Sequence, residues 1–280
     1  MVEVADGRRL RAAPAGPAIS RRPLVVLEAG SFGFSADWAA VQARLTAEGL
    51  RSLAYDRAGL GWSDPGPEPR DSRAIVADLE ALLAALGETG PLILCGHSMA
   101  GLHARLFAGR NASRLEALVL VDAVTPEASE HPLAAQMVGH FTNLSRLAAW
   151  GAKAGLARPL AGPMGDAIGL PPLAKAEKRR AFGDPAHNRW AAAEVAAWPA
   201  SVDQARAAGV YDAELPIALV LTGDGRTPSA RHALQTAPIG AARHGFAIHV
   251  PHANHASLLG ERHADHVVRA ILTVEAAGKR

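Results

Sequence analysis

The most informative stretch of the chain is LILCGHSMAG, at residues 92–101. Its apolar run at 92–95 is typical of a strand buried on both faces, and a helical pattern of apolar residues begins just after Ser98. A serine at such a sharp strand-to-helix corner has a strained backbone and an exposed hydroxyl. The residues two positions away must be small, as Gly96 and Ala100 are. We therefore predict that Ser98 is a nucleophile; the alternative is a helix-capping serine flanked by glycines that serve packing.

Further short apolar runs predict the rest of a sheet. They lie at 24–27, 53–55, 115–121, 217–221 and 246–250, and two weaker runs at 2–5 and 8–12 flank a hairpin turn at Asp6-Gly7. Apolar stripes at 75–86 and 264–271 indicate helices between or after the strands. This alternation predicts an α/β fold with an eight-stranded, mostly parallel sheet and helices on both faces.

One long interval, residues 123–213, shows no convincing strand. It is rich in alanine, is interrupted by eight prolines and holds six of the thirteen aromatic residues. We expect it to be an inserted helical lid, with residues 1–122 and 214–280 forming the core domain. Large apolar side chains with few polar anchors are typical of small-ligand pockets, so we expect part of the lid to face a substrate. Its tryptophans Trp150, Trp190 and Trp198 are the candidates for the substrate pocket.

Composition limits the classes of function. The formal net charge is +2 with scattered basic residues, which argues against nucleic acid as a partner, and no apolar run is long enough to span a membrane. The N-terminus lacks the apolar region of a secretory signal, and the single cysteine, Cys95, excludes an intrachain disulfide. We expect a cytoplasmic monomer or homodimer that acts on a small molecule. The spacing of the cysteine and histidine residues indicates no metal site, and no cofactor motif is present.

Several motifs together resemble the α/β-hydrolase family, over nearly the whole chain outside the lid. EAGSFG at 28–33 is similar to the oxyanion loop of the family, and DRAGLGWSD at 56–64 to its D-x-x-G-x-G-x-S turn. GHSMA at 96–100 is similar to the nucleophile elbow, and ANHA at 253–256 to the histidine loop. The resemblance implies acyl hydrolysis without a cofactor. The family also contains transferases, perhydrolases, C–C bond hydrolases and catalytically dead receptors.

A serine hydroxyl needs an adjacent base to take its proton. Of the twelve histidines, His255 lies five residues past the last predicted strand, in a loop at the same sheet edge as Ser98. His249 lies within that strand and His252 is too close to its end. We predict that His255 is the general base.

Two aspartates qualify as the acid that orients this histidine. Asp224 follows the strand at 217–221, where most relatives carry the acid, but the usual G-x-x-D spacing would place the acid at 226, which is Arg226 here. Asp122 ends the preceding strand, as in some members of the family. We favour Asp122, because Arg226 could pair with Asp224 and hold it away from the histidine. Asp224 stays open as the alternative.

The resemblance also implies an oxyanion hole. Its first donor is the backbone amide of Met99, which follows the nucleophile, and its second comes from the loop after Leu27, with Ser31 preferred and Phe32 next to it. We expect Asp56 and Arg57 to form an ion pair that steadies their turn.

The function that these predictions favour is a serine hydrolase cleaving a small to medium apolar ester through an acyl-enzyme. A serine nucleophile argues against epoxide hydrolase and haloalkane dehalogenase activity, which need a carboxylate there. Two alternatives remain. A C–C bond hydrolase would be favoured by a lid arginine facing Ser98, and a non-catalytic ligand receptor by a histidine that neither aspartate reaches.

Overall fold

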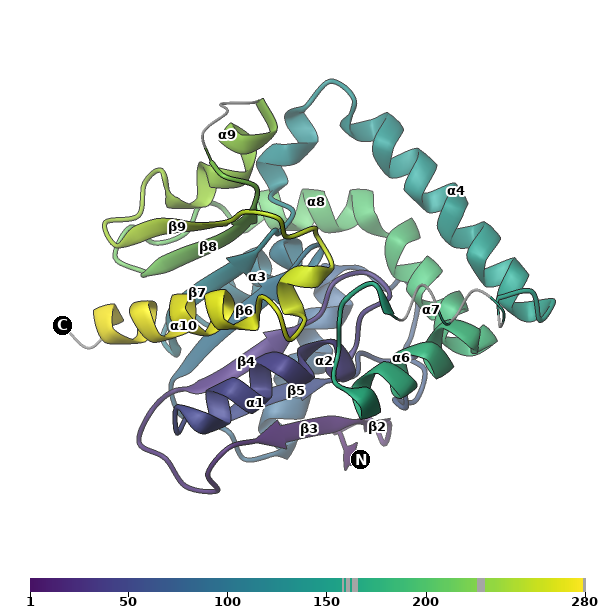
Figure 1. The fold of residues 1–280 in the computed structure, drawn as a ribbon, viewed down its shortest axis with the longest axis horizontal. Helices are drawn as coiled ribbons and strands as arrows, with labels where there is room; N and C mark the ends of the chain where they lie inside the picture. Colours follow the sequence, from purple (N-terminus) through teal and green to yellow (C-terminus); the bar gives the residue numbers. More distant parts are fainter. Residues whose placement is uncertain (158, 160–161, 163–165, 226–229, 279–280) are drawn as a thin grey trace.

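A seven-stranded sheet forms the centre of the molecule (Figure 1). The computed structural model describes residues 1–157, 159, 162, 166–225 and 230–278. The strand order is β3-β5-β4-β6-β7-β8-β9, and all neighbours are parallel except β3, which pairs antiparallel with β5 at one edge. The strands are β3 (Ala12–Ala15), β4 (Leu24–Glu28), β5 (Ser52–Tyr55), β6 (Leu92–His97), β7 (Leu115–Val121), β8 (Ile217–Thr222) and β9 (Gly245–Val250).

Helices cover both faces of this sheet because its strands are apolar on both sides. Val25 and Leu27 of β4 pack with α1 (Ala39–Ala47) and α10 (Ala264–Gly278), whereas Leu24 and Val26 pack with α2 (Ser72–Ala85) and α3 (Ala100–Arg110). Successive strand residues point to opposite faces, so a continuous apolar run fills two cores at once. The predicted fold class, an α/β sheet with helices on both faces, is confirmed.

The number of strands was predicted wrongly. Eight were expected, but β1 (Val2–Glu3) and β2 (Arg9–Leu10) form a separate two-stranded hairpin. The chain joins the main sheet only at β3, because the backbone of Arg9 is already bonded to the turn after β5: its amide donates to the Asp64 carboxylate and its carbonyl accepts from the Asp64 amide. The amide of Arg11 likewise donates to the Ser63 hydroxyl.

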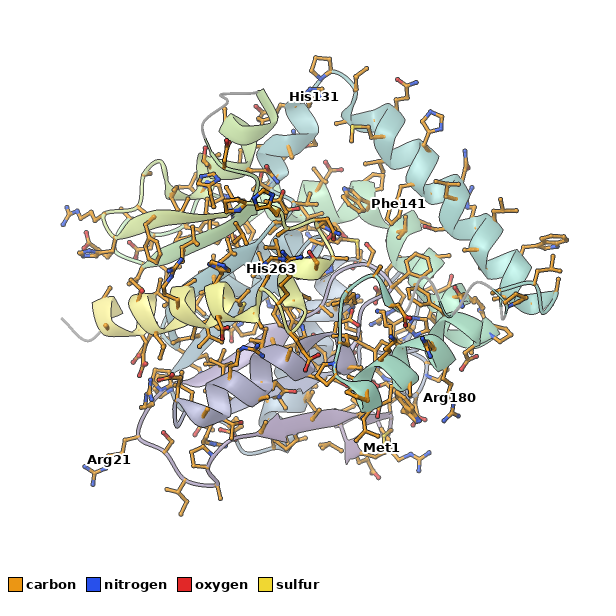
Figure 2. The ribbon with its side chains drawn as sticks, viewed as in Figure 1. Met1, Arg21, His131, Phe141, Arg180 and His263 are labelled. Carbon is orange, nitrogen blue, oxygen red and sulfur yellow. The ribbon has the colours of Figure 1, made fainter. Side chains whose placement is uncertain are left out.

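Between β7 and β8 the described residues form helices and no strand. They are the 3-10 helix η2 (Pro126–Glu130), α4 (Ala134–Lys153), α6 (Pro172–Gly183), α7 (Pro185–Ala196) and α8 (Trp198–Ala207). Helix α4 packs against α7, and α6 packs against α7 and the 3-10 helix η1 (Ser35–Trp38). Phe141 lies on the side of α4 that faces α7 and α8 (Figure 2).

The remaining elements follow β8 and β9. They are α9 (Ala230–Thr236) with η3 (Ala237–Ile239), and η4 (Ser257–Leu259), which leads into α10. Among the described helices, none is both long and apolar enough to cross a bilayer. The parallel strands β4, β6, β7, β8 and β9 all end at one edge of the sheet, so the loops that follow them meet there.

Candidate active site

Ser98 occupies the corner between β6 and α3 in a left-handed backbone conformation, with φ of 57°. Such a φ is costly for a residue with a side chain and persists only where its surroundings enforce it. Here the Ser98 amide donates to the Val121 carbonyl (3.1 Å), and the Ser98 carbonyl accepts from the Val124 amide (2.8 Å). A Cβ at Gly96 would lie only 3.3 Å from the Cβ of Ala100, so the corner tolerates Ala100 because its partner is glycine.

His255 and Asp122 complete a chain of hydrogen bonds that begins at Ser98. The Nε2 atom of His255 lies 2.9 Å from Ser98 Oγ, and its Nδ1 atom lies 2.6 Å from Oδ2 of Asp122. The imidazole is half exposed, whereas the carboxylate is buried. The other carboxylate oxygen, Oδ1, accepts a hydrogen bond from the side-chain amide of Gln235 in α9 (3.0 Å). The residues predicted as nucleophile, base and favoured acid are thus brought together.

The alternative acid, Asp224, is exposed in the loop after β8, whereas Asp122 is the carboxylate that contacts the Nδ1 atom of His255. Arg226, which was expected to hold Asp224 away from the histidine, lies outside the described residues. Gln235, which helps to hold Asp122, was not foreseen from the sequence, since no motif marks it.

His97 anchors the loop that carries His255. Its Nε2–H donates to the backbone carbonyl of His255 (3.0 Å), and the two rings lie 4.6 Å apart between centroids. Burial, together with the neighbouring His255, lowers the pKa of His97 to about 3. This histidine is therefore neutral at physiological pH and acts as a structural donor.

The loop at residues 29–33 lies against the nucleophile. A Cβ at Gly30 would lie 2.8 Å from the Cβ of Ser98, so only glycine fits there. The Ser31 hydroxyl contacts the sulfur of Met99 (3.3 Å), and Phe32 has a φ of 57°. Met99 stands at the N-terminus of α3, where backbone amides have no partner inside the helix and the helix dipole favours negative charge. The three predicted oxyanion residues therefore lie around Ser98.

Asp56 and Arg57 do not pair with each other, contrary to our expectation. Arg57 is buried between Glu28 and Glu194, with its Nη1 2.7 Å from a Glu28 oxygen and its Nη2 2.8 Å from a Glu194 oxygen. Asp56 accepts instead from the amides of Ser35 and Trp62, both at 3.0 Å. The sequence could not reveal this arrangement, because Glu194 lies in α7, 137 residues from Arg57.

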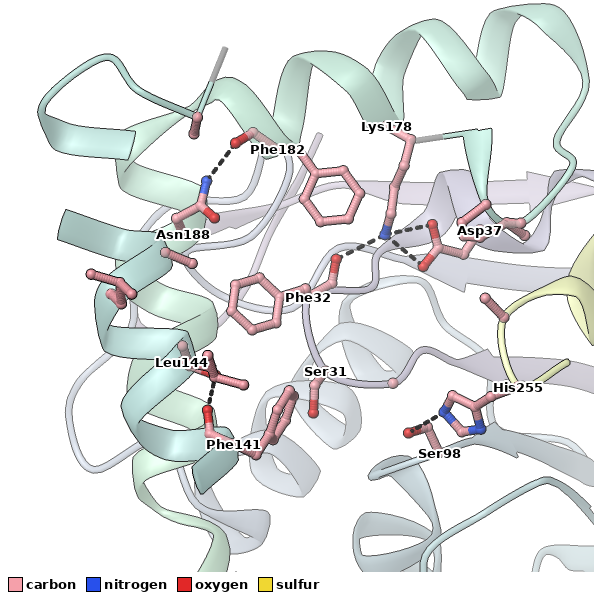
Figure 3. Close-up of a pocket in the computed structure, with 18 of the residues that line it drawn as sticks. Ser31, Phe32, Asp37, Ser98, Phe141, Leu144, Lys178, Phe182, Asn188 and His255 are labelled. Atoms are coloured by element: carbon pink, nitrogen blue, oxygen red, sulfur yellow. Dashed lines mark hydrogen bonds and ion pairs between the residues drawn. The ribbon is translucent and has the colours of Figure 1, made fainter. Parts of the chain in front are cut away.

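A cavity of about 820 Å³ opens beside Ser98 and His255 (Figure 3). Its wall is largely apolar and comes from the loop at 29–33, from α4 and from α6, including Phe32, Phe141, Leu144 and Phe182. A volume of this size is typical of sites for small organic ligands. The charged pair Asp37 and Lys178 also reaches the wall.

The three candidate tryptophans have different surroundings. Trp150 lines the cavity and is 62% exposed. Trp190 is buried against Leu60 and Gly59, and a Cβ at Gly59 would overlap the indole ring of Trp190. Trp198 packs beside Met99 and meets the ring of Phe141 edge-on, 6.0 Å away. Among the described residues, therefore, only Trp150 of the three contributes to the cavity wall, whereas Trp190 packs α7 against Leu60 and Trp198 packs α8 against Met99.

Lys178 is the cationic side chain on the described part of the cavity wall. It is buried, and its Nζ lies 2.8 Å from the Asp37 carboxylate. The hydroxyl of Ser145 on the wall donates to the Phe141 carbonyl in its own helix, and the side-chain amide of Asn188 donates to the carbonyls of Phe182 at the end of α6 and of Asp184 before α7. No group of His, Cys, Asp and Glu side chains suited to a metal ion occurs among the described residues.

Known proteins that are similar to this chain share its fold. A family model described as "alpha/beta hydrolase fold" matches residues 23–158. The structure of a thermophilic esterase from Thermogutta terrifontis is similar with a TM-score of 0.69 and 21% identity, covering 98% of both chains. An enol-lactonase from Burkholderia xenovorans LB400 is similar with a TM-score of 0.68 and 20% identity, also covering 98% of both chains. At these identities the likeness establishes the fold.

Curated relatives match shorter stretches. An "AB hydrolase superfamily protein" of Gibberella zeae is 31% identical over 112 residues, which is 39% of this chain and 34% of that protein. An uncharacterised protein of Schizosaccharomyces pombe is 34% identical over 73 residues, 26% of this chain and 14% of that protein. The chain thus covers about a third of the length of the first of these relatives and about a seventh of the second.

Proposed function

We propose that this chain, which has the α/β-hydrolase fold, is a serine hydrolase that cleaves small to medium apolar carboxylic esters. The observation that carries the proposal is the continuous chain of hydrogen bonds from Ser98 through His255 to Asp122, at 2.9 and 2.6 Å. This geometry suits a nucleophile, a general base and an orienting acid.

In the first half of the reaction, Ser98 Oγ attacks the ester carbonyl carbon while His255 Nε2 accepts the hydroxyl proton. The buried Asp122 stabilises the imidazolium that forms and holds its ring orientation. The amides of Met99 and Ser31 bind the oxygen of the tetrahedral intermediate. His255 then returns the proton to the departing alcohol, which leaves an acyl group on Ser98.

In the second half, His255 takes a proton from a water molecule that attacks the acyl-enzyme. Collapse of the second tetrahedral intermediate releases the carboxylic acid and restores Ser98.

The apolar cavity supports an uncharged, apolar substrate. Among the described residues of the cavity wall, Lys178 is the lysine or arginine, and it is already bonded to Asp37. A substrate that carries a carboxylate, such as a dienoate, would therefore find no free cationic partner among these residues. This favours ester hydrolysis over C–C bond hydrolysis. The contact of His255 with Asp122 likewise favours an enzyme over a non-catalytic receptor.

The proposal is tested with a series of p-nitrophenyl esters from acetate to dodecanoate. Each methylene buried in the cavity contributes about 0.8 kcal/mol, so kcat/KM should rise up to about fourfold per methylene until the cavity is full. A folded protein that hydrolyses none of these esters above the rate of its Ser98→Ala variant contradicts the proposal.

A further inference from the structure

Two buried cations bind three backbone carbonyls of the loop at residues 29–33. Arg57 donates through Nη1 to the carbonyl of Ala29 and through Nη2 to that of Gly30, the latter at 2.8 Å. Lys178 donates through Nζ to the carbonyl of Phe32, also at 2.8 Å. Figure 3 shows Lys178 reaching from α6 to this carbonyl and to Asp37.

Both cations connect the loop to the inserted helices. Lys178 belongs to α6, and its side chain is only 4% exposed. Arg57 follows β5 in the core, but its Nε and Nη2 form two parallel hydrogen bonds with Glu194 of α7, at 2.9 and 2.8 Å. Charge-assisted and bidentate bonds of this kind are stronger and more directional than neutral ones. The loop is therefore held from the insertion as well as from the sheet.

These contacts determine where the loop amides point. In a trans peptide the C=O and N–H groups are antiparallel in one plane. Arg57, bound to the Gly30 carbonyl, thereby orients the Ser31 amide of the same peptide unit. Lys178 binds the carbonyl of Phe32, two residues further along the loop. The φ of Phe32, 57°, is unfavourable for a residue with a side chain and therefore needs a restraint from outside the loop.

We propose that Lys178 is a positioning residue for the oxyanion hole: its bond to the Phe32 carbonyl holds the loop so that the Ser31 amide meets the developing oxyanion. The inference rests on the proposed serine hydrolase function. It implies that docking of α6 onto the core completes the oxyanion hole. Asp37, which accepts from the same Nζ, then serves to keep Lys178 in place.

The test compares three variants with the wild type. Lys178→Met removes the donor but leaves Asp37 as an unpaired buried carboxylate, which can destabilise the fold. The double variant Lys178→Met/Asp37→Asn removes the donor without that charge. Lys175→Met, on the same helix, is the matched control, because Lys175 pairs with Asp166 at the surface. Thermal unfolding of each variant is measured alongside the kinetics.

Two inhibitors separate positioning from pocket shape. A trifluoromethyl ketone with an alkyl chain adds to the nucleophilic serine to form a tetrahedral oxyanion, whereas the methyl ketone of the same chain binds without reacting. We expect Lys178→Met and the double variant to lose about 10- to 100-fold in kcat on p-nitrophenyl butyrate, with KM within about threefold. The Ki for the trifluoromethyl ketone should rise by the same factor, while the Ki for the methyl ketone stays unchanged.

Wild-type values of kcat and Ki in both variants overturn the inference. So does a double variant that regains activity together with stability, because Lys178 would then be only structural. An equal loss of affinity for both ketones also overturns it, since the cavity itself would have changed. Failure of the proposed function looks different: the wild type would neither hydrolyse esters nor bind the trifluoromethyl ketone more tightly than the methyl ketone.

Discussion

The Nδ1 atom of His255 lies 2.6 Å from Oδ2 of Asp122, a carboxylate at the end of β7 that is 133 residues away in the sequence. The backbone of Asp122 is itself unusual, with φ of 41°, and its amide donates to the carbonyl of Val220 in the neighbouring strand (2.8 Å). This rigid strand end, together with the bond from Gln235, presents the carboxylate to the imidazole.

Asp122→Asn should therefore lower kcat for ester hydrolysis by about 10⁴-fold, because a carboxamide favours the wrong imidazole tautomer and cannot stabilise the imidazolium. Asp224→Asn, the matched change at an exposed aspartate, should keep kcat within about twofold. Steady-state kinetics on one p-nitrophenyl ester decide between them. A larger loss for Asp224→Asn would identify that residue as the acid.

Gly30→Ala should damage catalysis with little effect on the rest of the fold. The new Cβ would lie 2.8 Å from the Cβ of Ser98, and the displacement that relieves this contact moves the loop at residues 29–33. We expect a loss of about 10²-fold in kcat, the usual effect of misplacing a reacting group by about 1 Å.

The control for this change is Gly139→Ala in α4, where a Cβ would meet no atom within 4 Å. It should leave kcat unchanged and raise the free energy of unfolding by about 0.5–1 kcal/mol through helix propensity. If Gly30→Ala retains the wild-type kcat, the loop does not lie where we describe it.

His187 makes stability depend on pH. Its Nδ1 accepts a hydrogen bond from the amide of Gly61 (3.1 Å), and burial, aided by the nearby Lys178, lowers its pKa to about 3. Between pH 6.5 and 3 the unfolded chain binds a proton at this site that the folded protein does not. The free energy of unfolding therefore falls as pH falls through this range, by at most about 1.4 kcal/mol per pH unit for this group.

Urea unfolding at pH 7.0, 6.0 and 5.0 measures this dependence. His187→Gln should lose less stability between pH 7 and 5 than the wild type, and His140→Gln, at an exposed position in α4, is the matched control for loss of a histidine. An unchanged pH dependence in His187→Gln would mean that this side chain is not held neutral.

Substitution by alanine should have different effects on activity and stability at Trp150 and at Trp190. Trp150→Ala removes a cavity wall residue that is mostly exposed, so kcat/KM should fall more for octanoate than for acetate esters, with stability nearly unchanged. Trp190→Ala leaves a void beside Gly59 and Leu60 and should cost about 3–5 kcal/mol of unfolding free energy. Ester profiles and urea unfolding of both variants test this; equal profiles for Trp150→Ala and the wild type would exclude it from substrate contact.

Local patterns predicted most of the core sheet and the placement of Ser98, His255 and Asp122. Continuous apolar runs marked the six parallel strands to within two residues, because both faces of such strands are buried. The parallel arrangement then placed the loops after β6, β7 and β9 at one edge, so the three residues could be expected to meet.

Long-range contacts were not predictable in the same way. Glu194, which binds Arg57, and Asp37, which binds Lys178, each lie more than a hundred residues from their partner, and charge alone does not say which carboxylate a buried cation meets. Arg57 was therefore assigned to its neighbour Asp56, although adjacent residues of extended chain point to opposite sides. The first strands were misassigned because the turn at 56–64 competes for their backbone hydrogen bonds.

Covalent labelling of Ser98 tests the central claim most directly. Protein treated with a fluorophosphonate probe is digested with trypsin, which releases residues 74–105 as one peptide whose only serine is Ser98. We predict a single probe adduct on this peptide in the wild type, together with loss of esterase activity in proportion to labelling, and no adduct in Ser98→Ala. An unlabelled wild type, or a Ser98→Ala variant that keeps labelling and turnover, would contradict the account.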